Sequence, residues 1–393
     1  MEKSKKHILL QNNYSVAYTE EDVYVNESKF KQEEDETRSA KEIAETLKNK
    51  FYNTFLKKHF KHIVVLTAAG TSLDNGEKSG KTRDELWDEC QKEIEAFDKE
   101  IDKFKEKDFY KSKDIEELLS YVILFGKVNT DKKDSILQLQ KKLEKKIKEL
   151  CTLDLDYVAP HKDFLNKITA RKNNDARVQL FTTNYDTLFE QAANDAGFVI
   201  IDGFSFTQPR EFSGKWFDLD IVNREKTRLK QEESFVSKVF HLYKLHGSLN
   251  WEKENNKIIQ KNNSDEPLII YPASEKYESS YEQPYFEMMS RFQQALRKDE
   301  TLLIVIGFGF QDKHIQNVIV EAVEQNPSFQ LLIVNYNKKG GICTDNLDNF
   351  FNDKVQMQVK RNVNIIFDTF KDFTNNYPEN QVYYSKDQEN ATV

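Results

Sequence analysis

The sequence predicts an α/β fold in which a doubly wound parallel sheet carries helices on both faces. One observation is a series of short apolar runs, rich in branched residues, of the kind that buried parallel strands show. These runs lie at 63–66, 178–181, 198–201, 239–245, 302–306 and 331–334, with 363–367 as an edge strand. A second observation is the helical spacing of apolar residues between them, as at 43–55 and 313–324. Strands that alternate with helices in this way favour right-handed crossovers and a parallel sheet.

Composition and charge argue against several classes of protein. The 393 residues include 58 Lys and Arg and 66 Asp and Glu, a net charge of −8, which disfavours a protein that coats nucleic acid. Cys90, Cys151 and Cys343 form neither a zinc-binding pair nor a disulfide framework, and they suit a reducing cytosol. The longest apolar run, 302–310, is much shorter than the roughly 20 residues of a membrane-spanning helix. The N-terminus lacks the apolar core of a signal peptide. We therefore expect a cytoplasmic protein without a membrane anchor.

The chain divides by composition into two parts and an insertion. Residues 1–40 are polar and show no clear pattern, which predicts an arm that serves in assembly or is partly disordered. Residues 41–393 are expected to form the α/β domain. Within it, residues 83–165 are rich in charge and carry apolar side chains at helical spacing, which predicts a helical insert. A free-standing coiled coil is the weaker alternative, because no heptad pattern is sustained.

Small or polar residues follow five of the expected strands. They are Ala69 and Gly70, Thr183 and Asn184, His246 and Gly247, Gly307, and Asn335. The carboxyl ends of parallel strands meet at one edge of a sheet, where the ligands of such folds bind. One polar strand end carries little information, but five at the same place in their strands predict a pocket.

Each candidate residue also has a purely structural interpretation. The turn 68–72 can bring backbone N–H groups to a phosphate, but with a single glycine it is equally a tight turn without a ligand. Asp186 taken alone is best explained as a helix cap. Asn184 offers a neutral donor and acceptor that can hold a water or a carboxamide. His246 is either a catalytic base or a structural histidine.

Five segments together resemble the sirtuin-like domain in their order and spacing. They are Ala-Ala-Gly-Thr-Ser at 68–72, Thr-Thr-Asn-Tyr-Asp at 182–186, Leu-His-Gly-Ser at 245–248, Gly-Phe-Gly-Phe-Gln-Asp at 307–312 and the strand-end Asn335. The resemblance covers most of the chain between residues 60 and 340. It implies a Rossmann-like sheet that binds NAD, the only cofactor expected, as a substrate.

The resemblance implies a cofactor-binding role for each matching position. These positions are Ala69, Gly70, Thr71, Ser72, Asn184, Asp186, Gly307, Phe308, Gly309 and Asn335. The turn at Gly70 would hold the NAD diphosphate. Gly307 and Gly309 would border the adenosine side, and Asn335 would bind its ribose.

Three of the matching residues would take part in catalysis. His246 would be the general base, Asn184 would order water or the nicotinamide ribose, and Asp186 would contact the nicotinamide end. The chemistry that these roles imply is hydrolysis of the bond between nicotinamide and ribose. Nicotinamide leaves a cationic pyridinium as a neutral molecule, so the site needs to support an oxocarbenium-like transition state and to deliver water.

The sequence departs from the protein-deacylating sirtuins at several points. It lacks their four zinc-binding cysteines, so neither zinc nor another metal is expected, and the helical insert 83–165 replaces the zinc module. It lacks the Phe-Gly-Glu stretch of the acyl-peptide channel, and Ala68 replaces the first glycine of the phosphate turn. These features resemble the bacterial sirtuin-like NAD hydrolases of anti-phage defence, most of all the partners of HerA-type hexameric ATPases. That resemblance implies a homo-oligomer, such an ATPase as partner, and contact with nucleic acid only through it.

Three other functions remain open from the residues. A non-catalytic sensor of NAD or ADP-ribose would bind without turnover. An NAD-dependent protein deacylase would need a peptide groove. A nuclease is the weakest alternative, because no acidic cluster has the spacing of a metal site.

Overall fold

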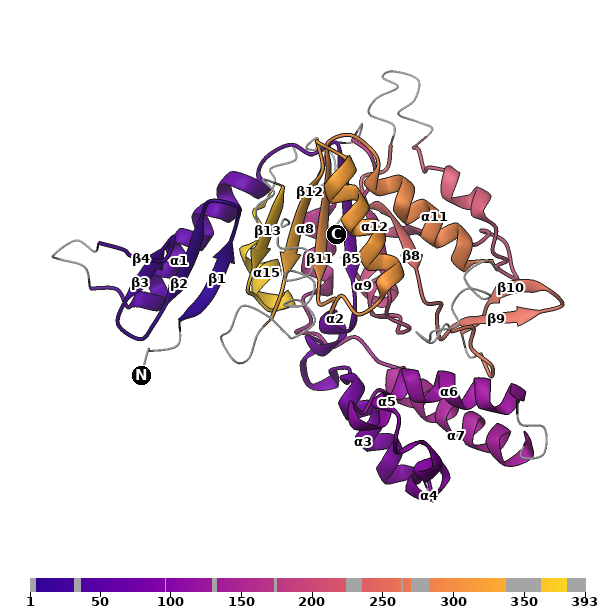
Figure 1. Ribbon diagram of the computed structural model, residues 1–393. Helices are drawn as coiled ribbons and strands as arrows, with labels where there is room; N and C mark the ends of the chain where they lie inside the picture. The colour runs from indigo at the N-terminus through magenta and orange to yellow at the C-terminus, as the bar shows by residue number, and fades with distance from the viewer. Residues whose placement is uncertain are drawn as a thin grey trace.

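The computed structural model describes residues 5–31, 37–95, 97–128, 133–172, 175–223, 235–262, 264–269, 283–336 and 362–379. Seven parallel strands form the body of its main sheet (Figure 1). In spatial order they are β13 (Val363–Ile366), β12 (Gln330–Val334), β11 (Thr301–Ile306), β5 (His62–Thr67), β6 (Gln179–Thr182), β8 (Val239–Lys244) and β7 (Val199–Ile201). The predicted doubly wound α/β fold is thereby confirmed.

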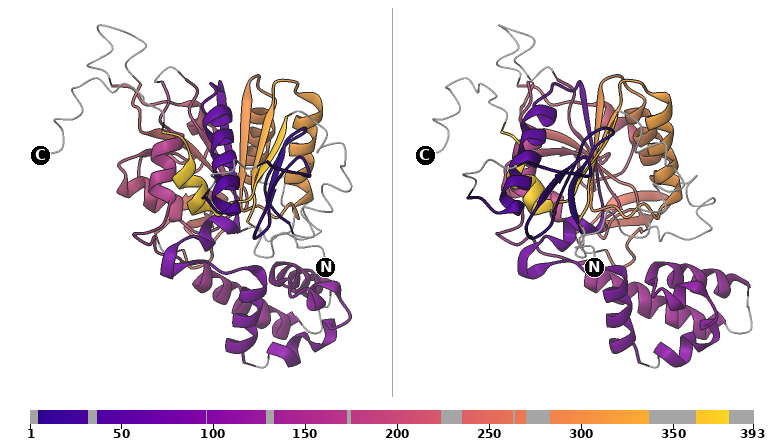
Figure 2. Two further views of the ribbon diagram at one scale, coloured as in Figure 1. Left: turned by 90° about the vertical axis from the view of Figure 1, so that its left-hand side faces the viewer. Right: turned by 60° about the vertical axis from the view of Figure 1, so that its left-hand side comes forward.

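The sheet is buried on both faces, which explains its nearly continuous apolar strands. Along β11, Leu302 and Ile304 point into one apolar cluster, whereas Leu303 and Val305 point into the other. Figure 2 shows the two layers of helices that cover these faces. The first layer contains α1 (Ala40–Phe51), α8 (His161–Ile168), α9 (Leu188–Asp195) and α15 (Phe370–Asn376), and the second contains α11 (Tyr285–Leu296) and α12 (Lys313–Gln325).

Four short strands at the N-terminus extend the sheet beyond β13 (Figure 1). They are β1 (Lys6–Leu10), β2 (Ser15–Tyr18), β3 (Val23–Val25) and β4 (Ser28–Lys29). Each pairs antiparallel with the next, and β1 pairs antiparallel with β13. The segment 5–31 therefore contributes four strands to the sheet, whereas the sequence predicted an arm that serves in assembly or is partly disordered; its role in assembly stays a prediction. For the same reason β13 is not the edge strand that was expected.

The N-terminal strands escaped prediction because their signals are short. Asn26 and Glu27 both have positive φ, as the two central residues of a tight hairpin turn require. The strands that flank this turn have only three and two residues, too few to show an alternating pattern. Ile8 and Val16 are buried in the main core beneath α1, so burial that only the tertiary fold supplies stabilises the strands.

A helical module lies off the end of the sheet where β5 ends (Figure 1). It contains α3 (Arg83–Glu93), α4 (Phe97–Ile101), α5 (Asp108–Lys111), α6 (Ile115–Val128) and α7 (Lys133–Cys151). These helices surround an apolar cluster of their own, which includes Trp87 and Leu118. The predicted insert reached residue 165, but Phe164 and Leu165 of α8 pack into the main core. The helical module therefore ends with α7.

Two smaller features complete the described chain. A hairpin of β9 (Trp251–Glu254) and β10 (Lys257–Gln260) turns at Asn255 and Asn256, which both have positive φ. The five-residue helix α2 (Ala69–Leu73) follows β5 directly. Within the described ranges, no helix combines the length and the apolar character that crossing a membrane requires.

His161 is a fully buried histidine whose titration should make the fold acid-sensitive. Its ring packs between Phe189 and Phe370, at centroid distances of 4.9 and 5.1 Å, and neither ring nitrogen has a hydrogen-bond partner among the described residues. Burial lowers the pKa of His161 to about 3. Between pH 6.5 and 3 the unfolded chain therefore binds a proton that the folded chain does not, and the free energy of unfolding falls as the pH falls.

His161→Leu should remove this part of the acid sensitivity. At pH 5 the proton linkage of His161 amounts to about 2 kcal/mol. We expect the variant to gain about that much stability relative to the wild type when urea unfolding at pH 5 is compared with unfolding at pH 7. An identical loss in both proteins would contradict the assignment.

Candidate functional site

The candidate residues gather at the carboxyl edge of the parallel strands. Pairing aligns the last residues of five strands in one row, namely Thr67, Thr182, Lys244, Ile306 and Val334. The chain runs from β5 toward β6 on one side, and from β11 toward β12 on the other. The crevice between β5 and β11 is therefore the topological switch point, where doubly wound folds bind their ligands.

Two glycines form the floor of this crevice. The Gly70 amide donates to the Gly307 carbonyl at 3.2 Å, and a Cβ atom added to either residue would lie 2.5 Å from the Cα of the other. Gly307 also has a φ of +66°, which favours glycine. The Thr71 amide donates to the Ala68 carbonyl at 2.9 Å. Two of the amides expected to hold a diphosphate are thus engaged within the protein, and the close backbone approach here is between the two glycines.

Gly307→Ala should destabilise the fold, whereas Gly309→Ala should not. The new methyl at 307 meets backbone atoms of Gly70 and requires a strained φ, which costs about 1–3 kcal/mol. No atom lies within 4 Å of a Cβ built at Gly309, so this variant is the matched control. Chemical denaturation measures both, and equal stability of the two variants would contradict the close approach.

Asn184 is tied to the turn after β5. Its Nδ2 donates to the Ala68 carbonyl at 3.1 Å, to Thr71 Oγ1 at 3.1 Å and to Ser72 Oγ at 2.8 Å. The Ala68 carbonyl can only accept, and the Ser72 hydroxyl gives its own proton to Asp186. The amide nitrogen of Asn184 therefore faces the turn. Its Oδ1 faces away from the turn as an acceptor, with no partner recorded among the described residues.

Asp186 fixes the Ser72 hydroxyl that accepts from Asn184. Its Oδ2 accepts from Ser72 Oγ at 2.6 Å, and its Oδ1 accepts from the Leu188 amide at 3.1 Å, at the start of α9. Thr187, not Asp186, is the N-cap residue of α9, so the helix-capping role that the sequence suggested for Asp186 is wrong, although Asp186 bonds to the first amide of the helix. Thr71 and Ser72 are buried as well. The side chains of these residues bond within the protein, and the predicted contact of Asp186 with the nicotinamide end stays a prediction.

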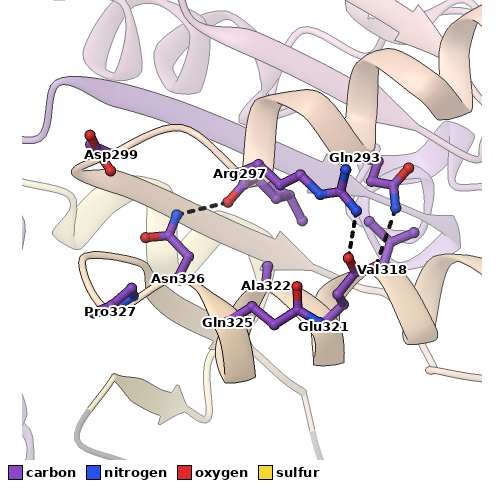
Figure 3. Close-up of a pocket in the computed structure, with 10 residues that line it drawn as sticks. Gln293, Arg297, Asp299, Val318, Glu321, Ala322, Gln325, Asn326 and Pro327 are labelled. Carbon is purple, nitrogen blue, oxygen red and sulfur yellow. Dashed lines mark hydrogen bonds and ion pairs between the residues drawn. The ribbon is translucent and has the colours of Figure 1, made fainter.

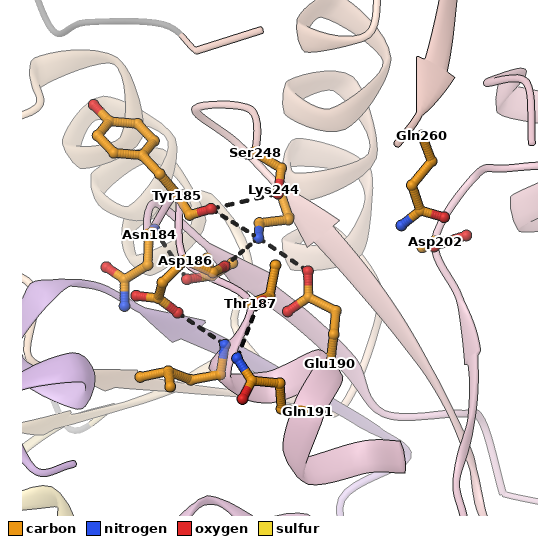
Figure 4. Close-up of polar contacts among 12 residues, drawn as sticks. Asn184, Tyr185, Asp186, Thr187, Glu190, Gln191, Asp202, Lys244, Ser248 and Gln260 are labelled. Carbon is orange, nitrogen blue, oxygen red and sulfur yellow. Dashed lines mark hydrogen bonds and ion pairs between the residues drawn. The ribbon is translucent and has the colours of Figure 1, made fainter. Parts of the chain in front are cut away.

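A buried lysine holds the loop that carries Asn184. Lys244 Nζ is 3.3 Å from the Tyr185 carbonyl and 2.9 Å from Glu190 Oε1, and it also donates to the Asp186 carbonyl (Figure 4). These three bonds account for all three protons of the ammonium group. Burial raises the pKa of Glu190, although Lys244 opposes that shift. Sequence reasoning missed this role, and the available signal was a lysine at the end of an apolar strand.

His246 follows β8 and is paired with a carboxylate. Its Nε2 lies 3.0 Å from Oδ2 of Asp312, the N-cap residue of α12. The Tyr185 ring lies 6.5 Å from the imidazole, centroid to centroid. Gly247 is required beside it, because a Cβ there would overlap the Leu268 carbonyl. Asp312 was part of the motif at 307–312, but it received no role from the sequence.

Contacts between the loops form a closed ring. The β11 loop meets the β5 turn at Gly307 and Gly70, and that turn meets the β6 loop through Asn184. The β6 loop meets the β8 loop, where the Leu249 amide donates to the Tyr185 carbonyl at 3.1 Å. The β8 loop returns to the end of the β11 loop through His246 and Asp312. Four segments predicted separately are thus linked by contacts at one edge of the sheet.

The β12 side of the crevice has an unused donor. Asn335 Nδ2 is buried and has no hydrogen-bond partner within the described part of the chain, while its backbone amide donates to Ile366. Gly309 is exposed, and Phe308 is partly buried beside Phe310. A buried unpaired donor is costly unless a ligand or water satisfies it. The predicted contact of Asn335 with a ribose stays a prediction.

The cavity drawn in Figure 3 is lined by none of the candidate site residues. Its volume is about 220 Å³, and it opens between the C-terminal ends of α11 and α12, at the edge of the sheet opposite to the site. Its lining includes Arg297 and Glu321, which form an ion pair at 2.6 Å. Among the described residues, no group of three or more His, Cys, Asp or Glu side chains is arranged to hold a metal ion.

The comparison with protein families supports the sequence resemblance for part of the chain. A family model described as a SIR2-like domain matches residues 178–346. The match includes Asn184, Asp186, His246 and Asp312, and it leaves the turn 68–72 outside. SIR2-like domains are in general NAD-dependent enzymes, so the match supports NAD-related chemistry. No curated protein matches the chain.

Proposed function

We propose that this chain is an NAD glycohydrolase, which cleaves the bond between nicotinamide and ribose to give nicotinamide and ADP-ribose. The observation that supports the proposal is the series of contacts that links the loops carrying Asn184 and His246 to each other and to the turn at Gly70 and the loop at Gly307. The SIR2-like match over the segment that contains both residues supports it.

The site residues suit NAD as a substrate. Gly309 leaves open space on the proposed adenosine side, whereas Gly70 and Gly307 pack against each other. The unpaired Nδ2 of Asn335 suits a ribose hydroxyl. The nicotinamide end would then point toward the loops after β6 and β8, which carry Asn184 and His246.

The proposed reaction needs a base and a fixed water. The water oxygen forms a bond to the anomeric carbon while the glycosidic bond breaks, and that electron pair leaves with neutral nicotinamide. His246 accepts the proton of the water. Asn184 Oδ1 accepts a hydrogen bond that orients the water without competing as a nucleophile. The Asp186 carboxylate lies behind Asn184 and favours the positive charge that develops on the ribose.

Product analysis tests the proposal. The purified chain is incubated with NAD, alone and with a HerA-type ATPase, and the products are identified by mass. Nicotinamide and ADP-ribose are expected. Turnover that depends on an acylated peptide would instead identify a deacylase. Binding measured by calorimetry without turnover in either preparation would identify a sensor.

The cellular setting is part of the same proposal. Uncontrolled hydrolysis of NAD would harm the cell, so we propose a cytoplasmic enzyme that is latent until it assembles as a homo-oligomer with a HerA-type ATPase. Activation during phage infection would then deplete NAD and stop phage growth. The sequence resemblance supports this role, and nucleotide measurements in infected cells with and without the active chain test it.

A further inference from the structure

We infer that Asp312 is a positioning residue that holds His246 in the tautomer with its proton on Nε2, so that Nδ1 is the atom that accepts the proton from water. This inference rests on the proposed NAD hydrolysis. It assigns a role to a residue that the sequence left without one.

The surroundings of Asp312 keep its carboxylate an acceptor. Its Oδ1 accepts from the amides of His314 at 3.0 Å and Ile315 at 3.5 Å, as the N-cap of the thirteen-residue helix α12. Two amide donors and the positive end of the helix dipole both favour the ionised form. An ionised carboxylate donates no proton. The hydrogen in the 3.0 Å contact between Asp312 Oδ2 and His246 Nε2 therefore belongs to the imidazole.

The same contact spans the candidate site. Strands β11 and β8 are separated in the sheet by β5 and β6, so their ends lie about 14 Å apart at the usual strand spacing. The segment from Gly307 to Asp312 crosses this interval to reach His246. Only 11% of the His246 side chain and 7% of the Asp312 side chain are exposed. Water therefore competes weakly for the bond, and the imidazole is held in one orientation.

This arrangement separates the two ring nitrogens by role. The opposite tautomer would place the lone pair of Nε2 against the lone pairs of a carboxylate, which is repulsive. With Nε2 protonated, the basic lone pair is on Nδ1. When Nδ1 takes a proton, the ionised Asp312 also stabilises the resulting imidazolium. In hydrolytic triads a carboxylate likewise fixes the tautomer of the histidine base and stabilises its imidazolium form.

Asp312→Asn is the decisive substitution. Asparagine has the same shape and is an equally good N-cap, so α12 keeps its start. Its amide can donate to Nε2, which stabilises the wrong tautomer. We expect kcat for nicotinamide release to fall by about 10²–10⁴-fold with little change in KM or in the urea midpoint. The acid limb of the kcat–pH profile should move to lower pH, because the imidazolium loses its neighbouring negative charge.

A second variant and a spectroscopic measurement separate this role from helix capping. Asp312→Ser keeps a capping side chain but cannot bond to Nε2, and it should also lose activity. Nitrogen-15 NMR of the histidine rings reads the tautomer directly, and the wild type should show the proton of His246 on Nε2.

The outcomes distinguish this inference from the proposed function. If the wild type cleaves NAD and Asp312→Asn matches its kcat and its pH profile, the inference is overturned and the function stands. If the wild type releases no nicotinamide, alone or with the ATPase, the proposed function fails. The NMR measurement still tests the tautomer in that case, and a wild-type proton on Nδ1 would overturn the inference.

Discussion

His246→Ala is expected to lower the rate of nicotinamide release by about 10²–10⁴-fold, because loss of a positioned general base removes a contribution of that size. The side chain lies at the carboxyl edge of the sheet and is bonded to Asp312, so its removal changes the site more than the core. Asn184→Ala should also abolish release, since it removes the acceptor proposed for the water. Product formation measured at saturating NAD gives the effect on kcat.

A matched control comes from the opposite edge of the sheet. His59 precedes β5, and 61% of its side chain is exposed, so His59→Ala should retain wild-type activity. Circular dichroism should show that each variant keeps its fold. Normal NAD cleavage by folded His246→Ala would rule out His246 as the base.

Asp368→Ala is expected to destabilise the fold by about 3 kcal/mol, the low end of the usual cost of breaking a buried ion pair, because Lys48 keeps its second partner, Glu45, at 2.6 Å. Asp368 follows β13, and its carboxylate accepts from Lys48 Nζ at 2.6 Å and from the Tyr52 hydroxyl at 2.5 Å. Burial lowers the pKa of Lys48, but Asp368 and Glu45 more than offset this effect, so the pKa is raised and the ammonium stays charged. Urea unfolding of the purified variant measures the loss.

An exposed ion pair provides the comparison for this prediction. Lys113 and Asp88 lie 2.7 Å apart in the helical module, with 47% and 56% of their side chains exposed. Lys113→Met should cost at most about 1 kcal/mol, because solvent screens such pairs. A loss for Asp368→Ala as small as that for Lys113→Met would show that Asp368 is not needed to compensate Lys48.

The sheet could be predicted because the evidence for it is local. The run 302–306 is apolar at every position, since both faces of a central parallel strand are buried, and it became β11 (Thr301–Ile306). The positions of Asn184 and His246 at strand ends were predictable for the same reason. Once the strands are parallel, their carboxyl ends lie at one edge.

The contacts across that edge were beyond prediction. The sequence gives no indication that Lys244 donates to three acceptors. Two of these acceptors are carbonyl oxygens of a different loop. Similarly, the sequence offered Asp186 as a helix cap or a ligand contact, whereas the structure adds its bond to Ser72, 114 residues away along the chain.

By itself, the sequence of this protein determined which segments become the parallel strands, which helices cover them and which polar residues stand at the ends of those strands. Those outcomes follow from apolar periodicity and turn chemistry, which act over a few neighbouring residues. Only the tertiary structure decided that Asp312 meets His246 and that residues 5–31 extend the sheet beyond β13. Both depend on side chains and strand edges that come together only after the chain has crossed the sheet, so no local pattern specifies them.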